Sequence, residues 1–295
     1  MPNDQMGGAS KDERRAALST FLTERNLSKA RASVPDDDAV SESFDETNPG
    51  KLKRIIVILS TPRSGSTLLC DLLRTTNVCN AHEYFQPYGY LPLLAERFGA
   101  VWEAEFDETT FLKGLVNSRT LPDGTLGINL HGHHLWVFEL FSNLLDGIEV
   151  RYIRLVREDR LAQAVSFSAA KQTGKWSSKF DAFGERSYNA LGIRDALAQI
   201  ETQERMIDAF LERHRLEAKT VSYEQLLSDQ AAILGTIAGR AVDNSGALPT
   251  LSQQRDATSL EYAERFKIDL LEPPEPTTLF DHLVNRMWAL LAKLK

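Results

Sequence analysis

The stretch Arg54-Ile-Ile-Val-Ile-Leu-Ser-Thr-Pro-Arg-Ser-Gly-Ser-Thr67 decides the fold of this chain. Its five β-forming residues, 55–59, predict a buried strand, because strands covered on both faces carry unbroken apolar runs. The small-residue turn leads into a predicted helix over 66–76, whose apolar side carries Leu68, Leu69, Leu72 and Leu73. A strand, a tight loop and a helix N-terminus bring backbone N–H groups and the positive end of a helix dipole together. The stretch therefore predicts an anion-binding site.

The loop resembles the Walker A loop of nucleoside-triphosphate enzymes but lacks the residues on which triphosphate binding depends. Ser60 replaces the first glycine, Ser66 replaces the lysine, and the cation is Arg63, two residues before Gly65. A sulfuryl group beside one phosphate carries less charge than a triphosphate, so a guanidinium, hydroxyls and backbone amides can hold it. Arginine suits this task because its planar fork donates to two oxygens at once.

Residues 61–67 resemble the 5′-phosphosulfate loop of sulfotransferases that use 3′-phosphoadenosine 5′-phosphosulfate (PAPS). The following Leu68-Leu69 and the later Glu83-Tyr84-Phe85-Gln86 resemble the bacterial trehalose 2-sulfotransferase family in particular. The resemblance implies a PAPS-dependent sulfotransferase whose donor-binding loop consists of Pro62, Arg63, Ser64, Gly65, Ser66 and Thr67. It also implies a homodimer and a small hydroxylated acceptor, such as a sugar or glycoconjugate. Sulfuryl transfer needs no metal, so none is expected.

A second pattern follows the third predicted strand, 149–156. Arg157 ends that strand, and Ser166 lies about two turns into the next predicted helix, so both can face one anion. The resemblance assigns Arg157 and Ser166 to the 3′-phosphate of PAPS. Arg160 is the competing phosphate ligand, and a surface ion pair is the alternative role of Arg157.

Three later segments carry weaker candidates. Tyr223 closes the fourth predicted strand, where the resemblance places a tyrosine near the adenine; a place at the rim of the core is its alternative. Trp176 could line the nucleotide side or the acceptor side; an exposed loop aromatic packed on the long predicted helix is its alternative. Arg255 and Arg265 bracket a segment that resembles the family's C-terminal part, which makes both candidate phosphate contacts.

Transfer to an alcohol also needs a base that takes the hydroxyl proton. The resemblance to trehalose 2-sulfotransferases implies Glu83, and burial among Tyr84-Phe85 would raise its pKa and strengthen it as a base. The rival is His131, which ends the second predicted strand, where eukaryotic cytosolic sulfotransferases carry a histidine. Asn129 stands where a lysine is expected in both families, so Arg63 is expected to stabilise the leaving group alone.

Two other functions remain open at this point. A P-loop kinase of unusual sequence would depend on Mg²⁺-ATP, and a non-catalytic protein would bind PAPS or its desulfated product PAP. The run 131–134 contains three histidines, but without neighbouring cysteines or a patterned carboxylate it is a weak zinc motif.

The composition of the chain limits the class of protein and the kinds of partner further. The 295 residues are 42% hydrophobic and 25% charged, as in soluble globular proteins, and the net charge of −7 argues against a nucleic-acid partner. Two cysteines, Cys70 and Cys79, cannot form a disulfide framework. No membrane span or signal peptide is expected, which predicts a cytoplasmic protein.

The chain divides into an N-terminal helix and acidic linker, 1–50, and a sulfotransferase domain, 51–295. Within the first part, residues 11–32 read as one helix and 34–50 as a solvated connector. The second part alternates predicted strands at 55–59, 125–130, 149–156 and 218–223 with predicted helices at 66–76, 133–145, 159–171, 188–214, 229–239 and 278–294. This alternation predicts an α/β, P-loop-type three-layer fold with a central, mostly parallel sheet flanked by helices.

Overall fold

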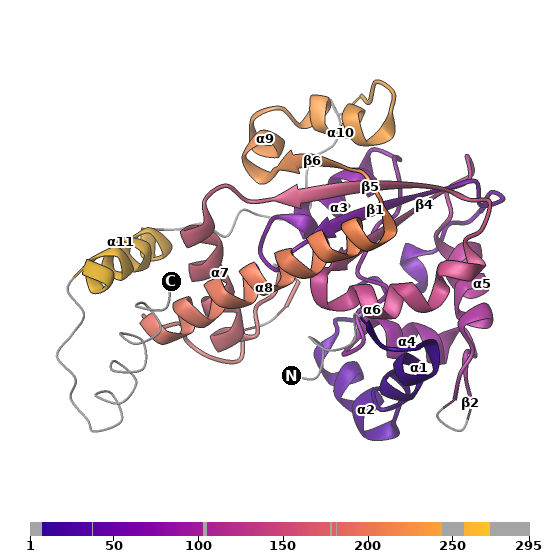
Figure 1. The fold of residues 1–295 in the computed structure, drawn as a ribbon, viewed down its shortest axis with the longest axis horizontal. Helices are drawn as coiled ribbons and strands as arrows, with labels where there is room; N and C mark the ends of the chain where they lie inside the picture. The colour runs from indigo at the N-terminus through magenta and orange to yellow at the C-terminus, as the bar shows by residue number, and fades with distance from the viewer. Residues whose placement is uncertain are drawn as a thin grey trace.

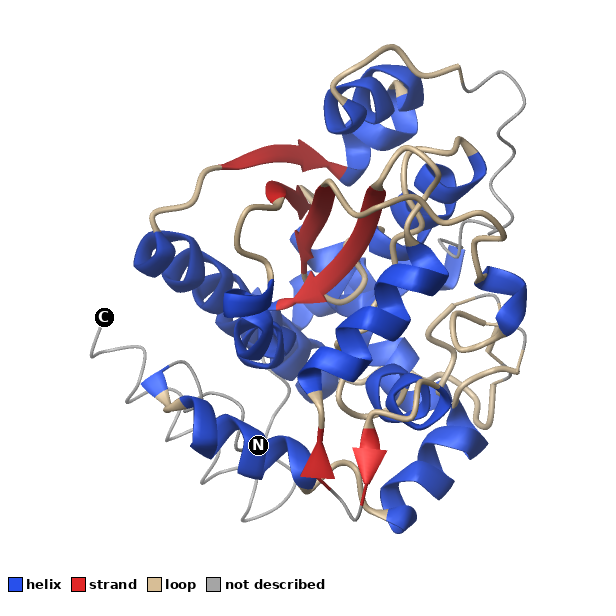
Figure 2. Cartoon of the chain, turned by 90° about the vertical axis from the view of Figure 1, so that its right-hand side faces the viewer, coloured by secondary structure: helices blue, strands red, loops and turns tan. Residues whose placement is uncertain are grey.

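A parallel sheet of four strands, in the order β4-β1-β5-β6, forms the centre of the structure (Figure 1, Figure 2). The computed structural model describes residues 8–36, 38–102, 105–177, 179–180, 182–243 and 257–271. The strands are β1 (Arg54–Ser60), β4 (Thr125–His131), β5 (Glu149–Val156) and β6 (Ala218–Ser222). Ser60 pairs with His131 and Val156 with Ser222, so the carboxyl ends of the strands meet at one edge. The four predicted strands and their parallel arrangement are confirmed.

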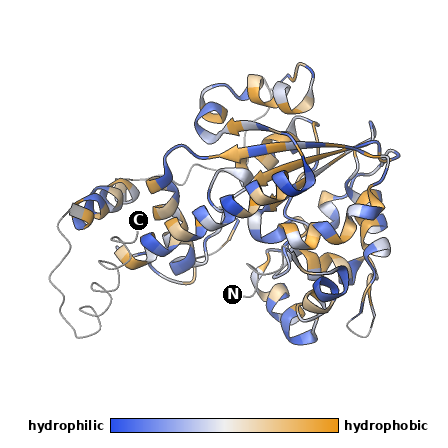
Figure 3. Ribbon diagram, in the orientation of Figure 1, coloured by the Kyte–Doolittle hydropathy of each residue, from blue (hydrophilic) through white to orange (hydrophobic). Residues whose placement is uncertain are grey.

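Helices cover both faces of this sheet, which confirms the predicted three layers. Alternate residues of β1 separate the layers: Ile55 and Val57 pack with one group of helices, and Ile56 and Ile58 with the other. The first layer contains α1 (Lys11–Ser19), α4 (Tyr90–Arg97), α5 (Glu108–Arg119) and α6 (Leu135–Phe138). The second contains α3 (Ser66–Thr75), α9 (Tyr223–Ser228) and α10 (Gln230–Ala238). Figure 3 shows β1 and β4 as largely hydrophobic, as strands buried on both faces must be.

A third apolar cluster joins α7 (Arg160–Thr173), α8 (Ala190–His214) and α11 (Ala257–Leu271). Figure 1 shows α7 and α11 beyond the arrowheads of the strands, next to the edge where ligands bind in parallel sheets. Phe167, Ile200 and Phe266 are buried between these three helices. Within the described residues, no helix combines the length and the apolar character needed to cross a bilayer.

Two predicted helices differ from the structure. Residues 11–32 form two helices, α1 and α2 (Glu24–Ser33), separated by a turn in which Asn26 Nδ2 donates to the Thr20 carbonyl oxygen at 2.8 Å. Residues 132–144 form three short helical segments, η3 (Gly132–His134), α6 and η4 (Glu139–Leu144), instead of one helix. The rings of Trp136, Phe138 and Phe141 from these segments are buried in the main core. The predicted helix at 278–294 lies outside the described residues.

Smaller elements complete the chain. A hairpin of β2 (Val101–Trp102) and β3 (Glu105–Phe106) precedes α5, and a 3₁₀ turn, η2 (Glu42–Phe44), lies in the acidic linker. The linker is less solvated than its composition predicts, because Asp38 is 4% exposed and Ala39 is fully buried.

Arg119 holds this N-terminal part against the rest of the protein. Its side chain is fully buried, and its guanidinium forms an ion pair with Asp45 and donates through Nη2 to the carbonyl oxygen of Ala39 at 2.7 Å. The ring of Tyr84 lies 5.8 Å from the guanidinium carbon. A buried cation of this kind connects elements that are distant in sequence.

We expect Arg119→Ala to lower the free energy of unfolding by about 1–3 kcal/mol, because it leaves the buried Ala39 carbonyl without its donor and leaves Asp45 paired with Arg97 alone. Urea unfolding followed by circular dichroism measures this change. Arg205→Ala is the control, since the Arg205–Glu201 pair is 62% and 69% exposed and contributes less than about 1 kcal/mol. Equal losses in the two variants would contradict the structural role of Arg119.

Candidate active site

The turn between β1 and α3 has the geometry of an anion-binding loop. Arg63 and Gly65 both lie in the left-handed region, with φ of 63° and 94°, and the Ser64 N–H donates to the Thr61 carbonyl oxygen at 3.2 Å. Helix α3 begins immediately afterwards at Ser66, so its first N–H groups lack partners within the helix. Backbone N–H groups and a helix N-terminus therefore converge beside a guanidinium, as predicted.

Gly65 is required here for two reasons. A side chain at φ 94° is strained, and a Cβ atom would lie 2.4 Å from Cδ2 of Tyr223. The ring of Tyr223 therefore packs directly against the loop, and the Arg157 guanidinium lies 4.8 Å from its centroid. Tyr223 thus lies beside the loop and Arg157, while its place near the adenine stays a prediction.

Gln163 fixes the same loop from helix α7, and the sequence analysis missed it. Its side chain is fully buried, and Nε2 donates to both Thr61 Oγ1 and the Pro62 carbonyl oxygen at 2.8 Å. The only sequence signal is a polar residue among the buried positions Ala164 and Val165. Its partners lie more than 100 residues earlier, so no local pattern identifies it.

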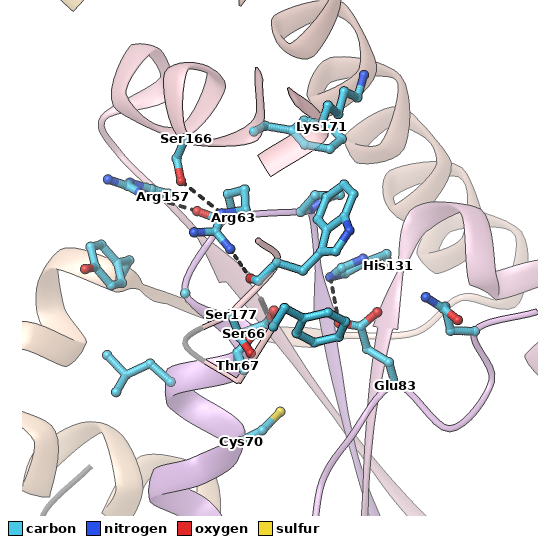
Figure 4. Close-up of a pocket in the computed structure, with 18 of the residues that line it drawn as sticks. Arg63, Ser66, Thr67, Cys70, Glu83, His131, Arg157, Ser166, Lys171 and Ser177 are labelled. Carbon is cyan, nitrogen blue, oxygen red and sulfur yellow. Dashed lines mark hydrogen bonds and ion pairs between the residues drawn. The ribbon is translucent and has the colours of Figure 1, made fainter. Parts of the chain in front are cut away.

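Two arginines crowd the predicted phosphate sites (Figure 4). Arg63 Nε donates to Ser166 Oγ at 2.9 Å, and Arg157 Nη1 donates to the Arg63 carbonyl oxygen at 3.1 Å. Burial, and then the charge of Arg157, lower the pKa of Arg63 to about 10. Two cations held this closely favour a bound anion. The rival Arg160 instead forms an ion pair with Glu204.

The two candidate bases lie side by side (Figure 4). Glu83 Oε1 is 3.7 Å from His131 Nε2. The Glu83 side chain is 20% exposed, and burial raises the pKa of its carboxyl group, with a smaller contribution from Asp38; the charges of His82 and His133 oppose the shift. Burial lowers the pKa of His131 to about 3. At neutral pH the imidazole is therefore uncharged and a weak base.

Two further histidines, His133 and His134, lie beside His131. His133 Nδ1 lies 2.9 Å from Gln203 Oε1, and burial lowers the pKa of His133 to about 4. One ring nitrogen from each of His131, His133 and His134 lies within 4.8 Å of the others. Three imidazoles at this spacing could hold a metal ion. A metal-free reaction stays a prediction.

Asn129 occupies the expected lysine position without supplying a cation. The amide is buried, and its Oδ1 accepts from Ser60 Oγ at 2.8 Å, which joins the ends of β4 and β1. This position therefore has a structural role between the two strands. Arg63, which lines the cavity, stays the sequence-predicted cation for the leaving group.

One cavity of about 1520 Å³ brings these groups together. The predicted residues that line it are Pro62, Arg63, Gly65, Ser66, Thr67, Glu83, His131, Arg157, Ser166 and Tyr223. Ser64 is buried beneath the loop instead. Trp176 also lines the cavity, and its carbonyl oxygen accepts a hydrogen bond from Arg63.

Arg265, one of the two late arginine candidates, does not line the described cavity. The guanidinium carbon of Arg265 lies 4.1 Å from the centroid of the Tyr188 ring, and Arg255 lies outside the described residues. Helix α11 nevertheless contributes Ser259, Leu260 and Ala263 to the cavity lining.

Comparison with known proteins identifies the family. The sequence model of the Stf0 sulphotransferase family matches residues 55–126 and 143–269, well over half of the chain. Trehalose 2-sulfotransferase of Mycolicibacterium smegmatis is 27% identical, over 72% of this chain and 94% of that protein. Trehalose 2-sulfotransferase of Mycobacterium tuberculosis is 24% identical, over 73% and 95%. The sulfotransferase domain of the Synechococcus PCC 7002 olefin synthase is 18% identical, with coverages of 81% and 95% and a TM-score of 0.40. The chain therefore belongs to the Stf0 sulphotransferase family and is a sulfotransferase.

Proposed function

We propose that this sulfotransferase moves the sulfuryl group of PAPS to a hydroxyl of a small carbohydrate-like acceptor, with Glu83 as the general base. The observation that supports this most is the single cavity of about 1520 Å³, which has the anion-binding loop and two arginines at one end and a partly buried carboxyl group at the other. Sites for one drug-sized ligand have volumes of about 300–1,000 Å³. The cavity is thus large enough for a donor and an acceptor together.

The donor half fits PAPS through its charge and its hydrogen-bond donors. The loop amides and Arg63 would hold the 5′-phosphosulfate, and Arg157 and Ser166 would hold the 3′-phosphate. PAPS, as the donor substrate, supplies a sulfuryl group that is activated by its bond to phosphate. Membership of a sulfotransferase family argues against the kinase and against a protein that only binds PAP.

The acceptor half fits a sugar. Tyr88 and Tyr90 line it together with His82 and His133, and aromatic rings beside polar groups suit a molecule with apolar C–H faces and many hydroxyls. Both curated relatives are trehalose 2-sulfotransferases, which supports a sugar hydroxyl as the acceptor. Trehalose is accordingly the first acceptor to test.

The residues suggest a simple in-line transfer. Glu83 accepts the proton of the acceptor hydroxyl while the acceptor oxygen bonds to sulfur and the bond from sulfur to the phosphate oxygen breaks. Arg63 and the loop amides stabilise the negative charge that develops on that phosphate oxygen. Glu83 is the better base because burial raises its pKa, whereas the pKa of His131 is lowered to about 3.

Isothermal titration calorimetry with PAP tests the donor site. We expect Arg63→Ala and Arg157→Ala each to weaken PAP binding by about 10–100-fold, since each removes hydrogen bonds from a charged group worth about 1.5–3 kcal/mol. Arg160→Ala is the matched control, because its guanidinium pairs with Glu204. Preference for Mg²⁺-ATP over PAP, or equal losses in all three variants, would contradict the assignment.

Steady-state kinetics tests the base. We expect Glu83→Gln to lower kcat by about 10²–10⁴-fold with an unchanged Kd for PAP, because the amide cannot accept the proton. His131→Asn should retain most of the activity. The reverse order of the two effects would make His131 the base.

The pH dependence of kcat/KM gives an independent check on Glu83. The active form is the carboxylate, so the rate falls as the pH drops through the pKa of Glu83. Because that pKa is raised, the acid limb should lie above the ordinary value of 4.5. An acid limb at or below 4.5 would argue against Glu83.

The homodimer and the cytoplasmic location stay predictions from the sequence.

A further inference from the structure

Part of the cavity is built by residues that precede the region shared with the family. The family match begins at residue 55. Six residues of the earlier chain nevertheless line the cavity: Ala32, Ser33, Val34, Pro35, Asp38 and Phe44. We call residues 32–36 and 38–44 the N-terminal wall. The wall is attached to the rest of the protein at two places. Leu18 and Leu22, which precede it in the chain, are buried in the main core, and Arg119 donates to the carbonyl oxygen of Ala39 within it.

Asp38 is the charged centre of this wall. Its side chain is 6% exposed, and its Oδ2 accepts from the hydroxyl of Tyr90 at 2.7 Å. Its Oδ1 lies 3.4 Å from Lys179 Nζ and 3.6 Å from His82 Nε2. Burial alone would raise the pKa of Asp38, but its contacts with His82, Tyr90 and Lys179 lower it well below the ordinary range. Asp38 is therefore a fixed carboxylate that joins three segments of the chain.

Aromatic contacts tie the same segments together. The ring centroids of His82 and Tyr90 are 4.5 Å apart in an edge-to-face arrangement. The ring centroids of Phe44, which belongs to the wall, and His82 are 6.4 Å apart. Lys179 Nζ lies 4.9 Å from the centroid of Phe44. The side chains around Asp38 thus form one packed polar and aromatic cluster, rather than a set of independent surface pairs.

The cluster lies on the acceptor side of the cavity. His82 directly precedes Glu83, and a base must lie within hydrogen-bond reach of the acceptor hydroxyl. The donor-binding groups Arg63, Arg157 and Ser166 come from the β1–α3 loop and from the region of α7. The wall therefore bounds the space that an acceptor occupies next to Glu83.

We propose that the N-terminal wall is an acceptor-binding element of this sulfotransferase, and that Asp38 is the positioning residue that holds the wall against the segment carrying Glu83. This proposal rests on the proposed function, and it assigns acceptor selection to a part of the chain outside the matched family region. Asp38 acts through His82, Tyr90 and Lys179, which contact its carboxylate and also line the cavity.

The first test is Asp38→Asn in the full chain, with trehalose as the probe, titrated calorimetrically into protein saturated with PAP. We expect trehalose affinity to fall at least about tenfold, while PAP affinity changes less than about twofold. Asp36→Asn is the matched control, because Asp36 is an exposed carboxylate two residues away. In kinetic assays the KM for trehalose should rise and the KM for PAPS should stay constant.

A second variant guards against loss of folding in the first. Ala32 is exposed at the end of α2 and lines the cavity, so Ala32→Trp fills the acceptor side without disturbing the core. Ser28→Trp, one turn earlier on the same helix at another exposed position, is its control. We expect Ala32→Trp alone to weaken trehalose binding at least about tenfold.

Unchanged trehalose affinity in both Asp38→Asn and Ala32→Trp would overturn the proposal. So would an equal loss of PAP affinity, because the wall would then support the whole site. A wild-type chain that binds PAP but not trehalose would also overturn it, because the wall would then not bind the probe that it is proposed to accept. Failure of the wild-type chain to bind PAP would instead overturn the proposed function.

Discussion

The left-handed turn between β1 and α3 is the constraint on which the rest of the site depends. Its geometry requires glycine at position 65, where any side chain would be strained and would collide with Tyr223. Gln163 holds the turn from α7 through two hydrogen bonds. The loop, α7 and the start of α9 are thereby locked together, and the positions of Arg157 and Ser166 follow from that packing.

Burial affects the chemistry differently at the two ends of the cavity. At the donor end it lowers the pKa of Arg63, and the neighbouring Arg157 lowers it further, so an anion relieves the repulsion. At the acceptor end it raises the pKa of Glu83 and lowers that of His131, so both groups are less readily charged. A donor rich in negative charge and a neutral hydroxylated acceptor match this arrangement.

The sequence predicted the parts of the fold and the site that depend on local patterns. Residues 54–67 specify a strand, a turn and a helix within a short stretch, and Arg157 is placed by the end of its own strand. Gln163, Arg119 and Asp38 were missed because their partners lie about 50 to 140 residues away. No local periodicity reports such contacts.

The N-terminal part shows the same limit. Its acidic composition predicted a solvated connector, whereas tertiary contacts with Tyr90, His82 and Lys179 bury Asp38. Residues 11–32 carry a helical pattern throughout, but the chain turns between α1 and α2, where the Asn26 side chain donates to the Thr20 carbonyl oxygen.

The central claim is that one cavity binds PAPS and a sugar and transfers a sulfuryl group between them. Incubation of the protein with PAPS and trehalose, with both products quantified by mass spectrometry, tests this most directly. We expect PAP and a sulfated sugar to form in equal amounts, and PAP to form much more slowly when the sugar is left out. PAPS that remains intact, or that releases its sulfuryl group only to water in the presence of trehalose and other sugars, would contradict it.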